Sequence, residues 1–206
     1  MVTVDLIEIQ RLRKYVLVFL LGLLVVATAS ISDAWWPASK GVHKAIEWIG
    51  IALILVCIAG RTWCTLYIGT RKKRELVTTG PYSLCRNPLY AFTIVGAFGV
   101  GAQYASIVIA CAAAIATYAV FRNVVRHEEA FLANSFGAEF ARYAARVPRL
   151  LPRFNGWKDV PELNVSPQLI MRTFLDASLF LLAIPASEIV EQLQRQSILP
   201  VLFRLP

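Results

Sequence analysis

Residues 76–88, with the sequence LVTTGPYSLCRNP, form a polar and turn-rich segment between two apolar runs of the chain. Gly80-Pro81 and Asn87-Pro88 are strong turn signals. The neighbouring apolar runs are long enough to cross a bilayer. Charged or polar groups beside hydrocarbon are energetically costly unless they bind a partner. We therefore expect this segment to contribute to a polar site at the rim of a membrane.

The composition of the whole chain also favours a membrane protein. Hydrophobic residues make up 57% of its 206 residues, charged residues only 17%, and the mean hydropathy is +0.58. Soluble domains usually carry more charge than this. The net charge of +8 is better explained by a positive cytoplasmic rim than by nucleic-acid binding, because the sequence shows no aromatic-studded RNA platform. The length suits a single domain over residues 1–206.

Five apolar runs are candidates for transmembrane helices. The first, residues 15–30, follows three basic residues and is interpreted as an uncleaved anchor rather than a signal peptide. Gly99, Gly101 and Gln103 predict a tight turn between the third and fourth runs. The predicted fold is therefore all-α, a membrane bundle of about five helices. The four later runs are residues 45–68, 89–104, 105–121 and 169–190. The last of them lies in a predicted C-terminal helix over residues 168–190.

Ionisable residues and a proline lie inside these runs. Arg61 is interpreted as an arginine whose head group reaches the interface, with a cofactor pocket as the alternative. Arg172 and Asp176 are spaced i and i+4, so we expect a local ion pair on one helix face. Pro185 is expected to kink the last helix.

The distribution of lysine and arginine predicts the topology. Fifteen of them lie in residues 1–14, 69–87 and 122–165, and only four lie in residues 32–44 and 191–206. Because basic residues accumulate on the cytoplasmic side, we expect a cytoplasmic N-terminus and five crossings. The polar segments then share the face where a soluble cofactor is available. A bacterial inner membrane is the expected location.

The cysteines and histidines do not indicate a metal site. The four cysteines form no C-x-x-C pair, and the only histidines are His43 and His127. A zinc site needs clustered ligands, so we expect no structural metal. Three cysteines lie in apolar runs and are expected in the core. Cys85 lies in the polar segment and is a candidate for a functional role.

A second group of polar residues follows the fourth apolar run. Arg122, Arg126 and Glu129 are spaced i, i+4 and i+7 and share one helix face, with Glu128 on the adjoining face. Buried carboxylates beside arginines can hold an ammonium group or ribose hydroxyls, and Arg86 offers a planar fork of donors for a carboxylate or phosphate. From spacing alone, a solvated helix face with weak salt bridges is an equal alternative.

Two sequence blocks resemble the isoprenylcysteine carboxyl methyltransferase family. They are GPYSLCRNPLY at residues 80–90 and EEAFLANSFGAEFARYAARVPRLLP at residues 128–152. The family patterns are G-P-Y-x-x-x-R-H-P-x-Y and E-E-x-x-L…F-G-x-x-Y-x-x-Y…V-P-x-x-x-P. The resemblance covers residues 60–153, with both blocks in the right order and separation. It implies an integral membrane methyltransferase that binds S-adenosylmethionine in a cytoplasmic pocket and takes a lipid or lipidated acceptor from the bilayer.

Site residues carry over by position from these blocks. Arg122 matches an arginine that the family links to substrate or catalysis; with Arg126 and Glu129 it is a candidate catalytic residue. Asn87 replaces the usual histidine, which puts in doubt any role that needs a titratable imidazole. Phe140 stands where tyrosine is common. The implied cofactor-binding residues are Tyr82, Arg86, Asn87, Pro88, Tyr90, Glu128, Glu129 and Tyr143.

The expected reaction is methyl transfer to a carboxylate. Transfer from a sulfonium is a direct displacement, which depends chiefly on alignment of the reacting atoms. We expect Arg122 or Arg126 to steer an anionic acceptor, and Glu128 or Glu129 to hold the ammonium or ribose of the cofactor. N-methylation of a phospholipid headgroup is the main alternative, and it requires a base. An NADPH-dependent membrane reductase and a non-enzymatic membrane protein are further alternatives. The acceptor and the oligomeric state do not follow from the sequence.

Overall fold

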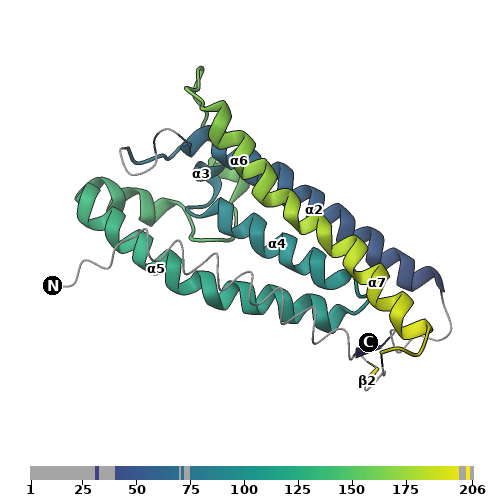
Figure 1. Cartoon of the computed structure of the whole chain (residues 1–206). Coiled ribbons are helices and arrows are strands. Elements are labelled where there is room, and N and C mark those ends of the chain that lie inside the picture. Colours follow the sequence, from purple (N-terminus) through teal and green to yellow (C-terminus); the bar gives the residue numbers. More distant parts are fainter. Residues whose placement is uncertain (1–30, 33–39, 70, 72–74, 200–202, 205–206) are drawn as a thin grey trace. The chain divides into compact units, whose positions relative to one another are not determined.

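The computed structural model describes residues 31–32, 40–69, 71, 75–199 and 203–204, and Figure 1 shows their helices. Apart from a parallel pairing of two-residue strands, β1 (Ile31–Ser32) and β2 (Phe203–Arg204), the regular elements described are helical. The predicted all-α class is therefore confirmed. The predicted first span, residues 15–30, lies outside the described residues.

Three helical stretches of the described chain are long and apolar enough to cross a membrane: Gly41–Ile68, Ile107–Arg146 and Pro167–Arg195. A fourth helix, α4 (Pro88–Ala102), has 15 residues and at about 1.5 Å per residue is shorter than the hydrocarbon core. The helices of the described residues are α2 (Lys40–Ile68), α3 (Pro81–Leu84), α4, α5 (Ile107–Arg146), η1 (Phe154–Gly156), α6 (Pro167–Ser178), η2 (Leu179–Leu182) and α7 (Ala183–Arg195).

Helix α5 joins two predicted segments. The fourth apolar run and the charged stretch after it both lie in α5, which spans 40 residues as two helical segments that meet at Gly137. At Gly137 the backbone leaves the helical region, with φ 47° and ψ −120°. A positive φ is open to glycine at little cost. Gly137 therefore bends α5 between Glu129 and Tyr143, two of the predicted site residues.

The last predicted span is also interrupted. The kink expected at Pro185 takes the form of the 3₁₀ segment η2, which ends three residues before it. A proline ring excludes the carbonyl four residues earlier, so the α-helical pattern cannot continue through this point. Arg172 and Asp176 of α6 are both exposed, and within the described residues no ion pair joins them. The expected local pair is therefore wrong.

The chain divides into two compact units. Unit 1 comprises Met1–Ile54, Ala97–Val124 and Phe180–Pro206, and unit 2 comprises Leu55–Gly96 and Val125–Leu179. The implied cofactor residues, together with Arg126, belong to unit 2, whereas Arg122 belongs to unit 1. That the whole chain acts as a single methyltransferase domain stays a prediction.

Within unit 1, the turn after α4 lies later than the sequence predicts. Helix α4 continues through Gly99 and Gly101, and the turn begins at Gln103. The glycines instead permit close packing of backbones. A Cβ atom on Gly99 would lie 2.7 Å from the carbonyl oxygen of Gly50, and one on Gly101 would lie 2.5 Å from Cα of Ala110. Small residues at such contacts are typical of helix packing in membranes.

Replacing Gly99 by alanine is expected to destabilise the packing of α2 against α4. The added methyl group would meet the Gly50 carbonyl at 2.7 Å and Ile54 Cγ1 at 3.0 Å, and overpacking of this kind costs about 1–3 kcal/mol. Thermal unfolding in detergent measures the change. Gly41→Ala is the matched control, because nothing lies within 4 Å of a Cβ there. Equal unfolding midpoints for the two variants would contradict the close packing.

Within unit 2, a buried cluster lies beside the polar segment. Trp63 stacks on Trp157 with ring centroids 5.7 Å apart, and the hydroxyl of Tyr67 donates to Asp159 Oδ1 at 2.9 Å. The segment after α5 is therefore fixed against α2. The centre of the cluster consists of four buried side chains, Cys64, Tyr67, Val77 and Tyr82.

The side chain of Arg61 makes a contact inside unit 2, although the sequence predicts its head group at the membrane–water interface. Its Nη1 donates to the hydroxyl of Thr93 at 2.9 Å, and Thr93 is 2% exposed. The guanidinium therefore faces α4. This contact argues against the interpretation of Arg61 as an arginine directed to the membrane surface.

Candidate functional site

The polar segment before α4 folds into a short helix with a fixed entry. Gly80 has φ 59°, and a Cβ atom there would clash with the ring of Tyr67, so both conformation and space require glycine. Pro81 begins α3, where its missing N–H leaves no hydrogen bond unmade. The N–H of Gly80 donates to the carbonyl of Lys158 at 2.7 Å, and the N–H of Lys158 donates to Ser83 Oγ at 3.1 Å.

Arg86 connects this segment to α5. Its Nε donates to Glu129 Oε1 at 3.0 Å and its Nη2 to Oε2 at 3.4 Å. Nη1 donates to two carbonyls at the end of α5, of Ala144 at 2.7 Å and Val147 at 3.2 Å. The side chain is 12% exposed. The planar fork of arginine suits this combination of a carboxylate and helix-terminal carbonyls, both of which carry negative charge.

Glu129 receives donors from three residues. Besides Arg86, Asn87 Nδ2 donates to Oε1 at 3.1 Å, and Arg149 Nε donates to Oε2 at 2.9 Å. Two guanidinium groups therefore share one carboxylate that is only 10% exposed. We call Arg86, Asn87, Glu129 and Arg149 the Glu129 cluster. It is a largely buried ion-pair network with an excess of positive charge, in which each charged group has a partner.

Asn87 stands where the family pattern has histidine, and the structure shows what its amide does. Besides Glu129, Nδ2 donates to the carbonyl of Arg149 at 3.2 Å, and the Asn87 N–H donates to the same carbonyl at 3.1 Å. The residue is 9% exposed. Its contacts are those of a neutral connector between the two sequence blocks, which need no proton transfer.

Two buried tyrosines lie next to the cluster. The hydroxyl of Tyr143 donates to the carbonyl of Tyr82 at 2.7 Å. The hydroxyl of Tyr82 is buried and, like Thr79 Oγ1, has no hydrogen-bond partner among the described residues. Burial raises the pKa of Tyr82 well above its usual value, so the phenol keeps its proton. Buried polar groups are rarely left without a partner, and these two hydroxyls fit a site for a polar ligand.

The other predicted site residues differ in their exposure to solvent. Arg122 and Arg126 are exposed on α5, and Glu128 is partly exposed. Pro88 and Tyr90 are buried in the first turn of α4. The solvated-face alternative therefore describes Arg122 and Arg126 but not Glu129.

Arg149 is the residue of the cluster that the sequence does not predict. It occupies a variable position inside V-P-x-x-x-P, and its one signal is a basic residue directly after the proline that ends α5. Cys85, a candidate for a functional role, is 2% exposed. Burial raises the pKa of its thiol to about 11, so the thiol is protonated at neutral pH and poorly suited to nucleophilic chemistry.

A depression on α6 is separate from these residues. It has a volume of about 580 Å³ and contains none of the predicted site residues. Both ionisable residues of the expected Arg172–Asp176 pair border it. The lining residues are Pro167, Gln168, Met171, Arg172, Leu175 and Asp176.

The chain is similar to a methyltransferase family model and to several known proteins. The family model described as phospholipid methyltransferase matches residues 45–139. The cobalt-zinc-cadmium resistance protein CzcN of Cupriavidus metallidurans is 35% identical over 76% of this chain and 72% of that protein. The nickel-cobalt-cadmium resistance protein NccN of Alcaligenes xylosoxydans xylosoxydans is 34% identical over 89% and 83%. Protein-S-isoprenylcysteine O-methyltransferase B of Arabidopsis thaliana is 26% identical over 69% and 76%. No solved structure matches the chain.

Proposed function

Because this chain belongs to the family of membrane methyltransferases that includes the phospholipid and isoprenylcysteine methyltransferases, we propose that it methylates a lipophilic acceptor held in the membrane. The family implies S-adenosylmethionine as the methyl donor. A carboxylate is the acceptor group we propose. A phospholipid amine is the second candidate, which the description of the matching family model favours.

The observation that carries this proposal is the Glu129 cluster. It joins Arg86 and Asn87 of the first sequence block to Glu129 and Arg149 of the second through contacts of 2.7–3.4 Å. A shared cofactor site requires the two blocks to meet. The cluster also supplies positive charge from two arginines, which suits a ligand with a carboxylate.

The contacts favour particular roles for the cluster around the cofactor. When bound, S-adenosylmethionine supplies an electrophilic methyl group on a sulfonium. The side chain of Arg149 is 49% exposed and would bind the carboxylate of the cofactor. Glu128 is partly exposed and would hold its ammonium or ribose. The oxygens of Glu129 already accept from three residues, so we propose that Glu129 chiefly positions Arg86 and Arg149, with direct binding to the ammonium as the alternative.

Exposed arginines on α5 bear on the choice of acceptor. We propose that Arg122 or Arg126 steers the acceptor, because a guanidinium attracts a carboxylate and disfavours a protonated amine. An amine would also require a base to remove its proton before transfer. Candidates for that base are His127, Glu128, Glu129 or a tyrosine. The positive surroundings therefore favour a carboxylate acceptor.

Contacts between segments that are predicted to lie on the same side of the membrane are consistent with the proposed topology. In unit 2, residues from the predicted cytoplasmic segments 69–87 and 122–165 touch one another, as in the Arg86–Glu129 pair. In unit 1, His43 and Glu191 from the opposite side are 3.1 Å apart. Each contact joins two segments that are predicted to lie on the same side of the membrane. The positive-inside rule assigns the more basic pair of segments to the cytoplasmic side. The cytoplasmic N-terminus and the bacterial inner membrane are part of this proposal.

Membranes that contain the protein are expected to transfer label from methyl-labelled S-adenosylmethionine to a lipid-soluble product. A methyl ester would release volatile methanol in base, whereas a methylamine would keep the label, so the same assay separates the two acceptors. Arg142→Ala, which removes an exposed arginine of α5 outside the proposed site, should retain activity. Absence of any labelled product with the unmodified protein, across lipid extracts from its host, would overturn the proposal.

Two of the relatives are named for resistance to divalent metals. We propose the same cellular context for this chain, in which methylation of a membrane component accompanies metal resistance. Growth of host strains with and without the active protein tests this, since loss of the active protein should then lower growth at raised zinc or cobalt concentration. Equal growth would remove this context without affecting the proposed reaction.

A further inference from the structure

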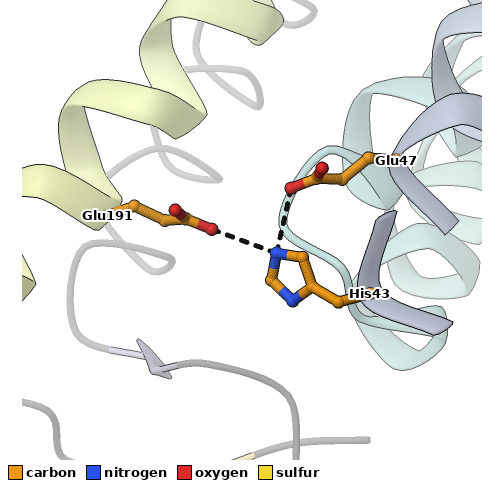
Figure 2. A group of neighbouring side chains, drawn as sticks. All are labelled: His43, Glu47 and Glu191. Atoms are coloured by element: carbon orange, nitrogen blue, oxygen red, sulfur yellow. Dashed lines mark hydrogen bonds and ion pairs between the residues drawn. The ribbon is translucent and has the colours of Figure 1, made fainter. Parts of the chain in front are cut away.

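Three side chains with metal-ligating groups converge in unit 1, where α2 begins and α7 nears its end (Figure 2). Nε2 of His43 lies 2.9 Å from Glu47 Oε1 and 3.1 Å from Glu191 Oε1. The three ligand atoms all lie within 4.8 Å of one another. Their side chains are 24%, 32% and 33% exposed. We propose that these residues form a binding site for a divalent transition-metal ion, a site separate from the proposed methyl transfer.

The distances between the ligand atoms fit such an ion. Zinc binds histidine nitrogen at about 2.0–2.1 Å and carboxylate oxygen at about 2.0–2.2 Å, so tetrahedral neighbours are separated by roughly 3.3 Å. The separations of 2.9 and 3.1 Å from His43 Nε2 are close to this value. Small side-chain rotations would therefore admit an ion. Three protein ligands leave a fourth position for water, as in open zinc sites.

The ligand set favours particular metals. Imidazole nitrogen suits zinc, cobalt and nickel, whereas magnesium prefers oxygen ligands in octahedral geometry. The two carboxylates, Glu47 and Glu191, balance the charge of a divalent ion when His43 is neutral. The site is therefore expected to prefer zinc or cobalt to magnesium.

Neighbouring residues hold the ligands in place. Arg195 Nη2 donates to Glu191 Oε2 at 2.9 Å, which leaves Oε1 facing His43. Gln103, which is 4% exposed, donates from Nε2 to the backbone carbonyl of Glu47 at 3.1 Å and fixes that turn of α2. Contacts of this kind orient metal ligands and contribute to affinity.

The sequence gives only a weak signal for this site. His43 and Glu47 are spaced i and i+4 on one helix face, but Glu191 lies 148 positions from His43. The expectation of no structural metal follows from the absence of a local cysteine or histidine pair. The contact between α2 and α7 supplies the third ligand, and only the fold reveals it. A protonated imidazole paired with two carboxylates is the alternative explanation of the same contacts.

Titration of the full-length, tag-free protein in detergent with cobalt chloride tests the site. The visible absorption spectrum of bound Co²⁺ reports its coordination geometry, and calorimetry with zinc chloride gives the stoichiometry. We expect one ion per chain, without competition from excess magnesium chloride. His43→Ala, Glu47→Gln and Glu191→Gln should each weaken binding by at least about tenfold. The matched controls are Glu188→Gln on α7 and His127→Ala, which removes the other histidine; both should bind normally.

Two results would overturn the site. The first is no cobalt or zinc binding by the unmodified protein, with His43→Ala changing only the unfolding midpoint, as for an ion pair without metal. The second is binding that persists in all three ligand variants or is lost equally in the controls. If His43→Ala does not fold, the Glu47→Gln and Glu191→Gln variants, which keep side-chain size, decide the question. The methylation assay is independent of these outcomes.

Discussion

Replacing Glu129 by alanine is expected to abolish S-adenosylmethionine binding and to lower the free energy of unfolding by about 3–5 kcal/mol. The Glu129 carboxylate is 10% exposed and pairs with Arg86, whose side chain is 12% exposed. Removing the carboxylate leaves a largely buried guanidinium without its counter-ion. Arg149, at 49% exposure, can regain hydration and contributes less to the loss of stability. Both arginines would lose the positions that the proposed cofactor contacts require.

Thermal unfolding in detergent and binding of labelled cofactor measure these two effects. Glu139→Ala, on the exposed surface of the same helix, is the matched control and should change neither. Glu129→Gln separates the proposed roles, because it keeps side-chain volume but removes the charge. Lost cofactor binding with unchanged stability in Glu129→Gln would favour direct contact with the ammonium. Unchanged affinity in Glu129→Ala would exclude both roles.

Replacing Arg86 by lysine is expected to lower methyl transfer by at least about tenfold and stability by roughly 2–3 kcal/mol. Lysine keeps the charge and can pair with Glu129. However, one ammonium group cannot also reach the carbonyls of Ala144 and Val147, which Arg86 Nη1 contacts at 2.7 and 3.2 Å. The end of α5 would then lose its charged donors, and with them the fixed position relative to the first sequence block.

Initial rates with labelled cofactor and an unfolding curve measure the Arg86→Lys effect. Arg146→Lys is the matched control, since it makes the same exchange at an exposed arginine of α5, close to the helix end that Arg86 contacts. We expect near-normal activity and stability in that control. If both exchanges had equal effects, or if Arg86→Lys retained full activity, the fork geometry of Arg86 would not matter for function.

Much of this architecture can be predicted from the sequence because apolar length and turn residues act locally. The runs around α2, α4 and the last span are visible as hydrophobic stretches, and Gly80-Pro81 marks the turn before α3. The sequence predicts the turn after α4 too early because Gly99 and Gly101 can serve a turn or a close helix contact equally well. Only the nearness of Gly50 and Ala110 decides between these uses.

The candidate site shows the same division between local and distant information. Spacing places Arg122, Arg126 and Glu129 on one helix face, but it cannot tell which of them is buried. In the structure Glu129 is buried because Arg86 and Arg149 approach it from other segments, whereas Arg122 and Arg126 are exposed. Contacts between segments far apart in sequence are therefore the part that the sequence alone does not reveal.

The bend of α5 at Gly137 constrains the length of the chain around it. Arg86 contacts Glu129 before the bend and the carbonyl of Ala144 after it. An inserted or deleted residue between these two positions would rotate the following helical turn by about 100° and turn that carbonyl away from Arg86. Nothing lies within 4 Å of a Cβ atom at Gly137, where the positive φ rather than space favours glycine. This stretch should therefore tolerate changes of side chain on its outer surface far better than changes of length.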